Sequence, residues 1–338
     1  MRFGIQVGTY LPGGWSAAQV RDHVRGIGAA AAEHHFDGLF AGQRYLAGKD
    51  TGIPQPLVLL SYLSGMAPEM YVGTSVFLLP LHDPVQVAEH TAALDVLSGG
   101  RFLFGIGLGY QDAEFEAFGV DKKTRRARAQ EAIGLIRRLW AEDEVDHDGT
   151  FFHLRGATIN PKPLQRPGPP VLVGADTLAS VQRAPELGDY WLPSRRHSKE
   201  FLRSALPVYR TVLERQGKPF VGLPMYRDLC VAESSQEAEV RVRVAYEAIY
   251  QRFSQTAHPG ERYDFNFEEL KRDRLIIGSP EEVRDQVLEY HREFGVEFMW
   301  FAVQWPGMDP RWSLETIRLF GDEVIPQVKK LTGAGRIP

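Results

Sequence analysis

Short apolar segments alternate with amphipathic segments of helical length along the whole chain, and this alternation restricts the fold more than any other feature. The apolar segments occupy residues 3–7, 38–41, 71–79, 101–106, 170–174, 190–192, 223–231 and 297–303. Several are apolar at consecutive positions, as expected of strands that are buried on both faces. Segments in which apolar residues recur at helical spacing lie between most of them. Residues 16–34 are an example, with apolar side chains at Val20, Val24, Ile27 and Ala31.

The predicted helices carry chemical start signals. Three of them show the capping-box pattern, at Ser16 with Gln19, Asp83 with Gln86, and Ser279 with Glu282. Strand, loop, capped helix and strand, repeated about eight times, is the pattern of a TIM-type (β/α)8 barrel. A doubly wound open sheet shows the same alternation and is the structural alternative.

Length and composition are those of a globular protein. The 338 residues carry a formal net charge of −4, and we expect one (β/α) barrel domain over residues 1–338. The acidic balance argues against a nucleic-acid binder. The single cysteine, Cys230, cannot form an internal disulfide and fits a reducing cytoplasm. Neither a signal peptide nor an apolar run of bilayer-spanning length is evident, so we expect a cytoplasmic protein without membrane association.

Two segments are insertions relative to the strands and helices of a minimal barrel. Residues 144–170 contain Gly149, Gly156 and several prolines, which predicts a small hairpin followed by an extended connector. Residues 254–273 are polar and include the sequence HPG, which predicts a long loop. Loops of this length are often functional, and we expect a lid over the site.

The most distinctive motifs lie between residues 71 and 110. They are VGTSVFLLPLHDP at 72–84, LDVLSGGRF at 94–102 and GIGLGY at 105–110. Tyr110 stands where the third glycine of a Rossmann fingerprint belongs, so a dinucleotide-binding turn is not indicated. The glycines instead predict either a strand exit that approaches a flat ligand closely or a turn without a ligand.

These motifs resemble the bacterial luciferase-like superfamily of flavin-dependent monooxygenases and deazaflavin-dependent oxidoreductases. Further matching sequences are FDGLF at 36–40, NPKP at 160–163, VLVGA at 171–175, GDYW at 188–191 and IGSPEEV at 277–283. Their order and spacing together are specific, and the resemblance covers nearly the whole chain. It implies a barrel with the flavin ring over the C-terminal ends of the strands, and a non-proline cis peptide in the third strand at Ser75–Val76.

The resemblance also implies the cofactor contacts. The flavin ring is expected beside Ser75 and Val76 and beside the fourth strand exit, and the phosphate is expected at the exits of strands five and six. A helix that starts near Thr177 offers unpaired N–H groups to an anion, and arginines add bidentate contacts. Asp176 would repel a phosphate, so we expect it to cap the helix. The remaining residues of this set are Leu108, Gly109, Tyr110, Gly174, Ala175, Ser194, Arg195 and Arg196, the last two being a solvated pair in the alternative interpretation.

One position departs from the family pattern. Many members carry a histidine just after the second strand, whereas this sequence has Arg44. Arginine stays protonated and cannot act as a general base, but it can hold an anionic substrate or a reduced flavin anion. Tyr45 follows directly, and His82 after the third strand can supply an imidazole. These three are the candidate catalytic residues.

The last strand exit carries Gln304 and Trp305, which we expect in the substrate pocket, together with Tyr110 as a further wall. The histidines do not cluster at metal-ligand spacing, and no metalloprotease or serine-hydrolase motif is present. We therefore expect no metal site.

The resulting prediction is a flavin-dependent monooxygenase that oxidises a small organic substrate with O2. Because no nicotinamide-binding fingerprint is present, reduced FMN is expected from a separate flavin reductase. The first alternative is deazaflavin-dependent hydride transfer, for which the acidic tail of the cofactor favours further basic residues such as Lys199. The second is a flavin-binding protein without catalysis, which the Arg44 substitution keeps open. A homodimer is consistent with the resemblance, although no single residue decides it.

Overall fold

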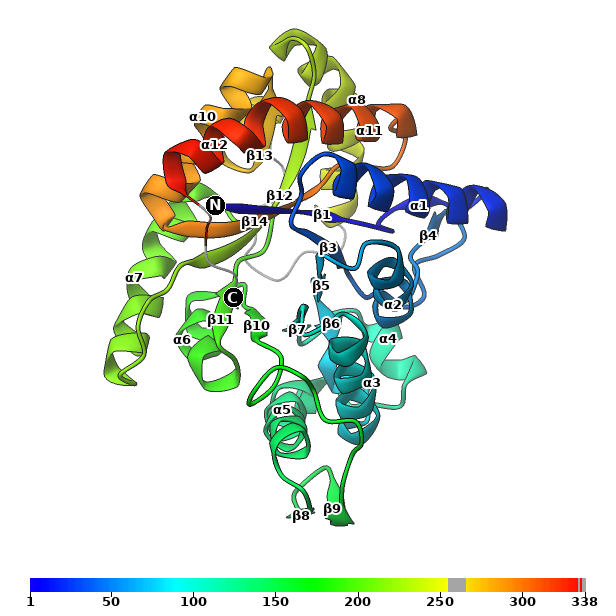
Figure 1. Ribbon diagram of the computed structural model, residues 1–338, viewed down its shortest axis with the longest axis vertical. Helices are drawn as coiled ribbons and strands as arrows, with labels where there is room; N and C mark the ends of the chain where they lie inside the picture. Colours follow the sequence, from blue (N-terminus) through cyan, green and yellow to red (C-terminus); the bar gives the residue numbers. More distant parts are fainter. Residues whose placement is uncertain (255–265, 334, 336–338) are drawn as a thin grey trace.

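A curled sheet of parallel strands, surrounded by helices, forms the centre of the molecule (Figure 1). The computed structural model describes residues 1–254, 266–333 and 335. The predicted TIM-type fold is confirmed, because each apolar segment of the sequence contains a barrel strand. The eight barrel strands are β1 (Arg2–Gln6), β3 (Gly38–Ala41), β5 (Tyr71–Thr74), β7 (Phe102–Gly107), β10 (Val171–Gly174), β11 (Tyr190–Leu192), β12 (Leu223–Val231) and β14 (Val296–Ala302).

The strand order identifies a barrel. Successive strands are neighbours in the order β11-β10-β7-β5-β3-β1-β14-β12, and the first strand pairs with the last in parallel register, Arg2 opposite Phe298. A doubly wound sheet would instead reverse its order at a switch point, so that alternative is excluded. A further strand, β13 (Leu275–Gly278), pairs with the end of β12 outside this order.

Side chains close the ring between β11 and β12. The described residues of these two strands share no ladder hydrogen bonds, and the Trp191 N–H of β11 donates instead to the Tyr209 hydroxyl at 3.1 Å. Arg195 Nη1 donates to Asp228 Oδ1 at 2.6 Å. Arg227 Nη1 donates to the carbonyl of Ser194 at 3.0 Å. Two arginines therefore tie the segment after β11 to β12.

Helices cover the outer face of the sheet (Figure 1). Two predicted capping boxes are confirmed, at Ser16 for α1 and at Ser279 for α10. Asp83 caps α3 by accepting the N–H groups of Val85 and Gln86, without a described return bond from the Gln86 side chain. The helices are α1 (Ala17–Glu33), α2 (Pro56–Met66), α3 (Pro84–Leu97), α4 (Asp112–Ala117), α5 (Arg125–Ala141), α6 (Leu178–Leu187), α7 (Lys199–Arg215), α8 (Ser235–Ser254), α9 (Phe267–Asp273), α10 (Pro280–Phe294), α11 (Pro310–Leu319) and α12 (Ile325–Thr332).

The barrel interior is filled by side chains, as in other barrels of this size. Its buried members include Leu103, Leu172 and Leu192. The Phe40 ring stacks on Trp300 with centroids 4.1 Å apart and planes 7° from parallel. A larger apolar layer lies between the strands and the helices. The interior below the strand exits is therefore a packed support for whatever binds above it.

The insertion at residues 144–170 contains an antiparallel hairpin of β8 (Val145–Asp148) and β9 (His153–Ala157). This hairpin projects at the lower end of the view in Figure 1. The connector that follows is held to the barrel because buried Asp95 accepts the backbone N–H of Gln165 at 3.0 Å and its side-chain amide at 2.6 Å.

The second predicted insertion, the lid at 254–273, lies largely outside the described residues, which omit 255–265. Its end is not a loop: residues 267–273 form α9, capped reciprocally by Asn266 and Glu269. This Asn-to-Glu capping box is visible in the sequence and was missed.

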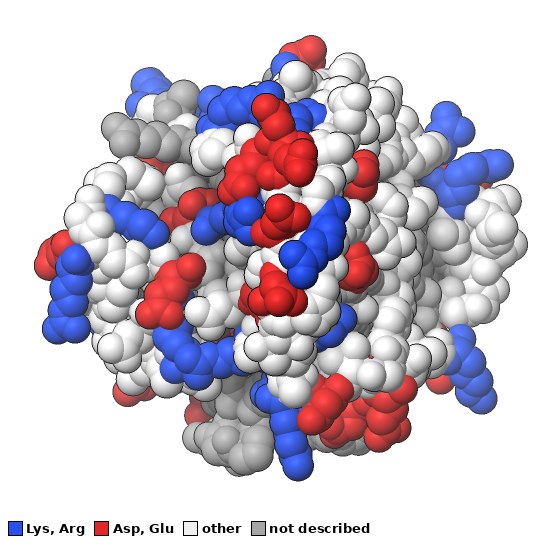
Figure 2. Space-filling view, turned by 90° about the horizontal axis from the view of Figure 1, so that it is seen from below, with Lys and Arg blue, Asp and Glu red and all other residues white. Residues whose placement is uncertain are grey.

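The charge and hydropathy of the described residues bear on two kinds of interaction, with a membrane and with a nucleic acid. None of the helices has both the length and the apolar composition needed to cross a bilayer. On the face drawn in Figure 2, acidic and basic side chains are interspersed and form no continuous basic patch. That face therefore provides no extended positive field for a nucleic-acid backbone.

Candidate active site

The third barrel strand is interrupted at Ser75–Val76, where the peptide bond is cis, as the resemblance implies. The predicted strand at residues 71–79 divides here into β5 and β6 (Phe77–Leu78), and β6 pairs with β7. Both residues are partly exposed. Ser75 Oγ accepts a hydrogen bond from the Trp300 indole at 3.1 Å, which leaves the hydroxyl proton of Ser75 to donate elsewhere.

Glycines surround this bulge because larger residues would overlap it. A Cβ on Gly105 would lie 1.9 Å from the carbonyl oxygen of Thr74, and one on Gly107 would lie 2.5 Å from Cγ2 of Val76. A Cβ on Gly42 would lie 2.9 Å from the carbonyl oxygen of Ser75. In the motif at residues 105–110, the bulge therefore accounts for Gly105 and Gly107 without a ligand.

We expect the Gly105→Ala substitution to lower the free energy of unfolding by about 1–3 kcal/mol, because the new methyl group overlaps backbone rather than a movable side chain. The matched control is Gly134→Ala in α5, where no atom lies within 4 Å of the new Cβ. That substitution is expected to stabilise the helix by about 0.5–1 kcal/mol. Urea denaturation measures both, and a Gly105→Ala variant as stable as the wild type would contradict the crowding argument.

The exits of β3 and β5 are joined by a hydrogen-bond cluster. Gln43 Oε1 accepts the Leu78 N–H at 2.8 Å and lies 3.1 Å from His82 Nε2, and Gln43 Nε2 donates to the Tyr45 hydroxyl at 3.1 Å. Because Gln43 Oε1 only accepts, His82 Nε2 carries the proton. Burial, with a smaller effect of His90, lowers the pKa of His82 to about 4. His82 is therefore a neutral hydrogen-bond donor of low basicity.

The exits of β3, β7 and β11 meet at Tyr110. Arg44 Nη1 donates to the Tyr110 hydroxyl at 3.1 Å, and the Arg196 guanidinium lies 5.9 Å from the centre of the same ring. No described carboxylate lies within ion-pair distance of Arg44. Burial raises the pKa of nearby Glu114, whose Oε1 accepts the Tyr45 N–H at 2.9 Å. Two cations thus flank one phenol ring.

Leu108 and Gly109, which precede Tyr110, face the protein. Leu108 packs against the main apolar core. Gly109 has a φ of 71°, and a Cβ there would lie 3.3 Å from the Phe115 ring. The residue of this strand exit best placed to meet a ligand is therefore Tyr110.

Arg195 does not face the region expected for the phosphate. It is buried and forms an ion pair with Asp228, 2.6 Å apart, and Nη2 donates to the Tyr10 hydroxyl at 2.9 Å. Asp228 also accepts from the Trp305 indole at 2.9 Å and from the Tyr246 hydroxyl at 2.5 Å. These contacts make Asp228 the centre of a buried polar network at the exit of β12.

Gln304 and Trp305, the two residues predicted for the substrate pocket, use their polar groups in hydrogen bonds within the chain. Trp305 is fully buried. Gln304 Oε1 accepts the Ser313 hydroxyl at 2.6 Å, and Nε2 donates to the carbonyl of Met308 at 3.3 Å. In the described chain neither presents a free polar group to a substrate.

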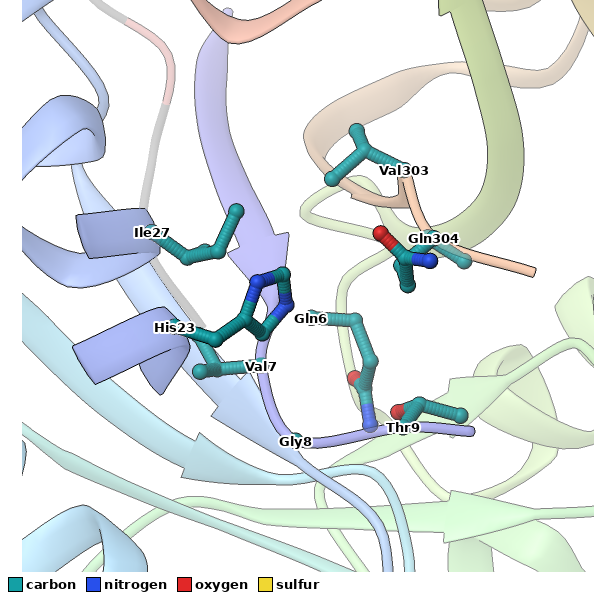
Figure 3. A pocket seen from close by; sticks show the side chains of 9 residues that line it. Gln6, Val7, Gly8, Thr9, His23, Ile27, Val303 and Gln304 are labelled. Carbon is teal, nitrogen blue, oxygen red and sulfur yellow. The ribbon is translucent and has the colours of Figure 1, made fainter. Parts of the chain in front are cut away.

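Gln304 lines a small cavity near the exits of β1 and β14, which His23 and Gln304 enter from opposite sides (Figure 3). Gln6 Oε1 is buried there without a hydrogen-bond partner in the described chain. The cavity has room for roughly one water molecule. It is too small for a flavin, so the cofactor must bind elsewhere.

The end of β10 leads into the helix expected to bind phosphate. Thr177, not Asp176, caps α6, because its Oγ1 accepts the Ser180 N–H at 3.2 Å and Ser180 Oγ accepts the Thr177 N–H at 2.9 Å. Our expectation that Asp176 caps is wrong, since Thr177 occupies that place. The N–H groups of Leu178 and Ala179 make no hydrogen bond in the described chain. They remain available to an anion.

Asp176 lies instead against the segment after β11. Its carboxylate is 3.6 Å from Arg196 Nη2 and 3.5 Å from His197 Nε2. His197 is only 7% exposed, and neither ring nitrogen has a hydrogen-bond partner of good geometry among the described residues, although Asp176 lies beside the ring. Burial lowers the pKa of His197 to about 4, against the opposing effect of Asp176. A buried imidazole with both nitrogens unsatisfied is rare and indicates a missing partner.

Sequence reasoning missed three residues of this region: His197, Arg227 and Asp228. One signal was present, because an adjacent Arg and Asp interrupt the apolar run of β12, and buried charges are rarely placed in a strand without a partner. No group of three or more described side chains is arranged to hold a metal ion.

The model of the luciferase-like monooxygenase family matches residues 1–297. The uncharacterized protein y4vJ of Sinorhizobium fredii is 26% identical over 89% of this chain and 87% of its own length. The alkanal monooxygenase alpha chain of Photorhabdus luminescens is 29% identical over 64% of this chain and 60% of its own. The F420-dependent glucose-6-phosphate dehydrogenase of Gordonia bronchialis is 23% identical over 90% of this chain and 93% of its own.

Solved structures agree with the fold. The monooxygenase RslO1 from Streptomyces bottropensis superimposes with a TM-score of 0.86 at 27% identity, covering 97% of this chain and 99% of that one. The oxygenating constituent of 3,6-diketocamphane monooxygenase from Pseudomonas putida, in complex with FMN, superimposes with a TM-score of 0.79 at 19% identity, covering 97% and 98%. At that identity the second likeness concerns the fold alone.

Proposed function

This chain belongs to the luciferase-like monooxygenase family of oxidoreductases, and from that premise we propose that it is a flavin-dependent monooxygenase of small organic substrates. In this proposal it takes reduced FMN from a separate flavin reductase and uses O2 as the oxidant. The observation that carries the proposal is the cluster of anion-binding groups beside β10 and β11. It consists of the two α6 amides that make no hydrogen bond in the described chain, the Arg196 guanidinium, which Asp176 faces at 3.6 Å, and the buried imidazole of His197.

The residues present fit FMN. The N–H groups of Leu178 and Ala179 and the Arg196 guanidinium would hold the phosphate. Ser75, with a hydroxyl proton still to donate, and Val76 would contact the ring at the bulge. When bound, the reduced flavin supplies the electrons for activating O2, while the chain orients it and limits access of water.

Arg44 sets the charge on the opposite side of the site. It is a permanent cation with only the Tyr110 hydroxyl as a described hydrogen-bond partner. It would hold an anionic group of the substrate or of the reduced ring, and Tyr110 would form a wall beside it. His82 is neutral with a pKa of about 4, so its part is to position Gln43 and Tyr45 rather than to accept a proton.

Deazaflavin-dependent hydride transfer is the second candidate. It is favoured by a surface cleft lined by Lys199, Lys271 and Arg272, which suits the acidic tail of a deazaflavin. Each of these cations already has a carboxylate, however. Lys199 Nζ lies 2.8 Å from Glu289, Lys271 contacts Glu239, and Arg272 lies 3.2 Å from Asp273. This pairing reduces the positive charge that the cleft offers to an acidic tail.

Anaerobic titration of the protein with reduced FMN, and separately with reduced deazaflavin, tests the proposal. We expect selective micromolar binding of reduced FMN, followed by faster consumption of O2 when it is admitted with a substrate from a screen of small organic compounds. Selective binding of deazaflavin would overturn the proposal. Binding of FMN without any turnover would favour the non-catalytic alternative.

We also propose that the protein is a homodimer. Sedimentation velocity is the measurement, and the expected species has twice the 38.0 kDa of one chain. A sedimenting species of 38.0 kDa at micromolar concentration would refute it.

A further inference from the structure

Arg227 is a buried cation that holds the segment at residues 194–198 from behind. It is 0% exposed. Its Nη1 donates to the carbonyl of Ser194 at 3.0 Å, and its Nη2 donates to the carbonyl of His197 at 3.1 Å. Its Nε donates to the Tyr290 hydroxyl at 3.1 Å. One guanidinium therefore fixes both ends of the turn that carries Arg195, Arg196 and His197.

Unlike its neighbours, Arg227 has no described counter-ion. Arg195 pairs with Asp228, and Arg196 faces Asp176, whereas every described acceptor of Arg227 is a carbonyl or a phenol. A buried charge without a partner is costly. A bound anion near the turn would offset part of this cost.

The position of that missing charge follows from the turn. The same turn carries His197, whose two ring nitrogens have no hydrogen-bond partner in the described chain, and Arg196, next to the start of α6. The α6 amides of Leu178 and Ala179 make no hydrogen bond with described residues either. Donors from two elements thus converge on one place. An anion of high charge density, with several acceptor oxygens, matches this set.

We propose that Arg227 is a positioning residue that makes this site selective for a flavin bearing a phosphomonoester. It shapes the turn at residues 194–197 through two carbonyls. It also adds a second positive charge to that of Arg196, and Asp176 offsets only one of the two, so the site still favours a bound anion. The inference rests on the proposed function, which places the FMN phosphate here. It goes further by assigning the recognition of phosphate to a residue that does not touch it.

The test compares FMN with riboflavin, which lacks the phosphate, on the full-length protein. In the wild type FMN binds more tightly than riboflavin. We expect Arg227→Met to weaken FMN binding by about 10- to 100-fold, the range found for outer-shell partners of bound metal ions, and to leave riboflavin binding unchanged. Arg227→Lys, which keeps the charge but not the two-carbonyl fork, restores part of the preference. Arg203→Met, which removes an exposed arginine from α7, is the matched control and is expected to change neither.

Inorganic phosphate provides a second readout that needs no flavin. We expect millimolar phosphate to raise the melting temperature of the wild type and of Arg203→Met, and to have no such effect on Arg227→Met. Equal losses of FMN and riboflavin binding in Arg227→Met would mean a purely structural role and would overturn the proposal, as would an equal phosphate effect in all variants or none in the wild type. A phosphate effect that depends on Arg227, without binding of FMN, would support the anion site and refute only the choice of cofactor.

Discussion

We expect the Asp228→Asn variant to lose about 3–5 kcal/mol of its free energy of unfolding, because removing one partner of a buried ion pair leaves the other charge uncompensated. Asp228 is 1% exposed and accepts from Arg195, Trp305 and Tyr246. Asparagine has nearly the size of aspartate, but its amide group brings two hydrogen-bond donors to a site where Arg195, Trp305 and Tyr246 already donate. Urea denaturation at neutral pH measures the difference.

The control for this substitution is Asp22→Asn on α1. Asp22 also pairs with an arginine, Arg21, at 2.9 Å, but both side chains are about 60% exposed. Exposed pairs contribute roughly 0–1 kcal/mol, so we expect almost no change. Similar losses in the two variants would show that burial of the Asp228 network has little energetic weight.

Acidification is expected to destabilise the protein through two buried histidines. Burial lowers the pKa of both His82 and His197 from 6.5 to about 4 in the folded chain. On acidification the unfolded chain takes up these protons at a higher pH than the folded chain does. The free energy of unfolding is therefore not reduced by these histidines above pH 6.5, and it decreases as the pH falls from 6.5 toward 4. Between pH 7.5 and pH 5 each contributes about 2 kcal/mol to the loss of unfolding free energy.

Urea denaturation at pH 7.5 and at pH 5 measures this effect. The His197→Asn variant is expected to lose about 2 kcal/mol less than the wild type over that interval. His153→Asn, which changes a histidine side chain that is 66% exposed on the hairpin, leaves the pH dependence as it is in the wild type. An unchanged pH dependence in His197→Asn would show that His197 is not buried as a neutral group.

The periodic features of this fold could be predicted from sequence. Strands buried on both faces read as apolar runs, and capped helices carry their own start signals, so the eight barrel strands and the caps at Ser16 and Ser279 followed directly. Short or polar elements carry weaker signals. The four-residue strand β13 and the helix α9, with its Asn266 cap, were missed for that reason.

Which strand exits meet could be predicted from sequence, but the contacts of the individual side chains could not. The strand exits at Arg44, Tyr110 and Arg196 do meet, because parallel strands bring their C-terminal ends to one side. Which partner each polar group takes depends on side chains that are remote in the sequence. Arg195 turns toward Asp228, 33 residues away, and Gln304 is occupied by Ser313. No local pattern encodes such pairings.

At the junction of β11 and β12 the barrel is held together by side chains, because the described residues of these two strands share no ladder hydrogen bonds. At the other seven junctions, backbone hydrogen bonds join the neighbouring strands and fix the distance between them. At this junction the described contacts are side-chain hydrogen bonds of Arg195, Arg227 and Asp228. Substitutions of these residues therefore change how the two ends of the sheet are joined without removing a ladder hydrogen bond from any other junction.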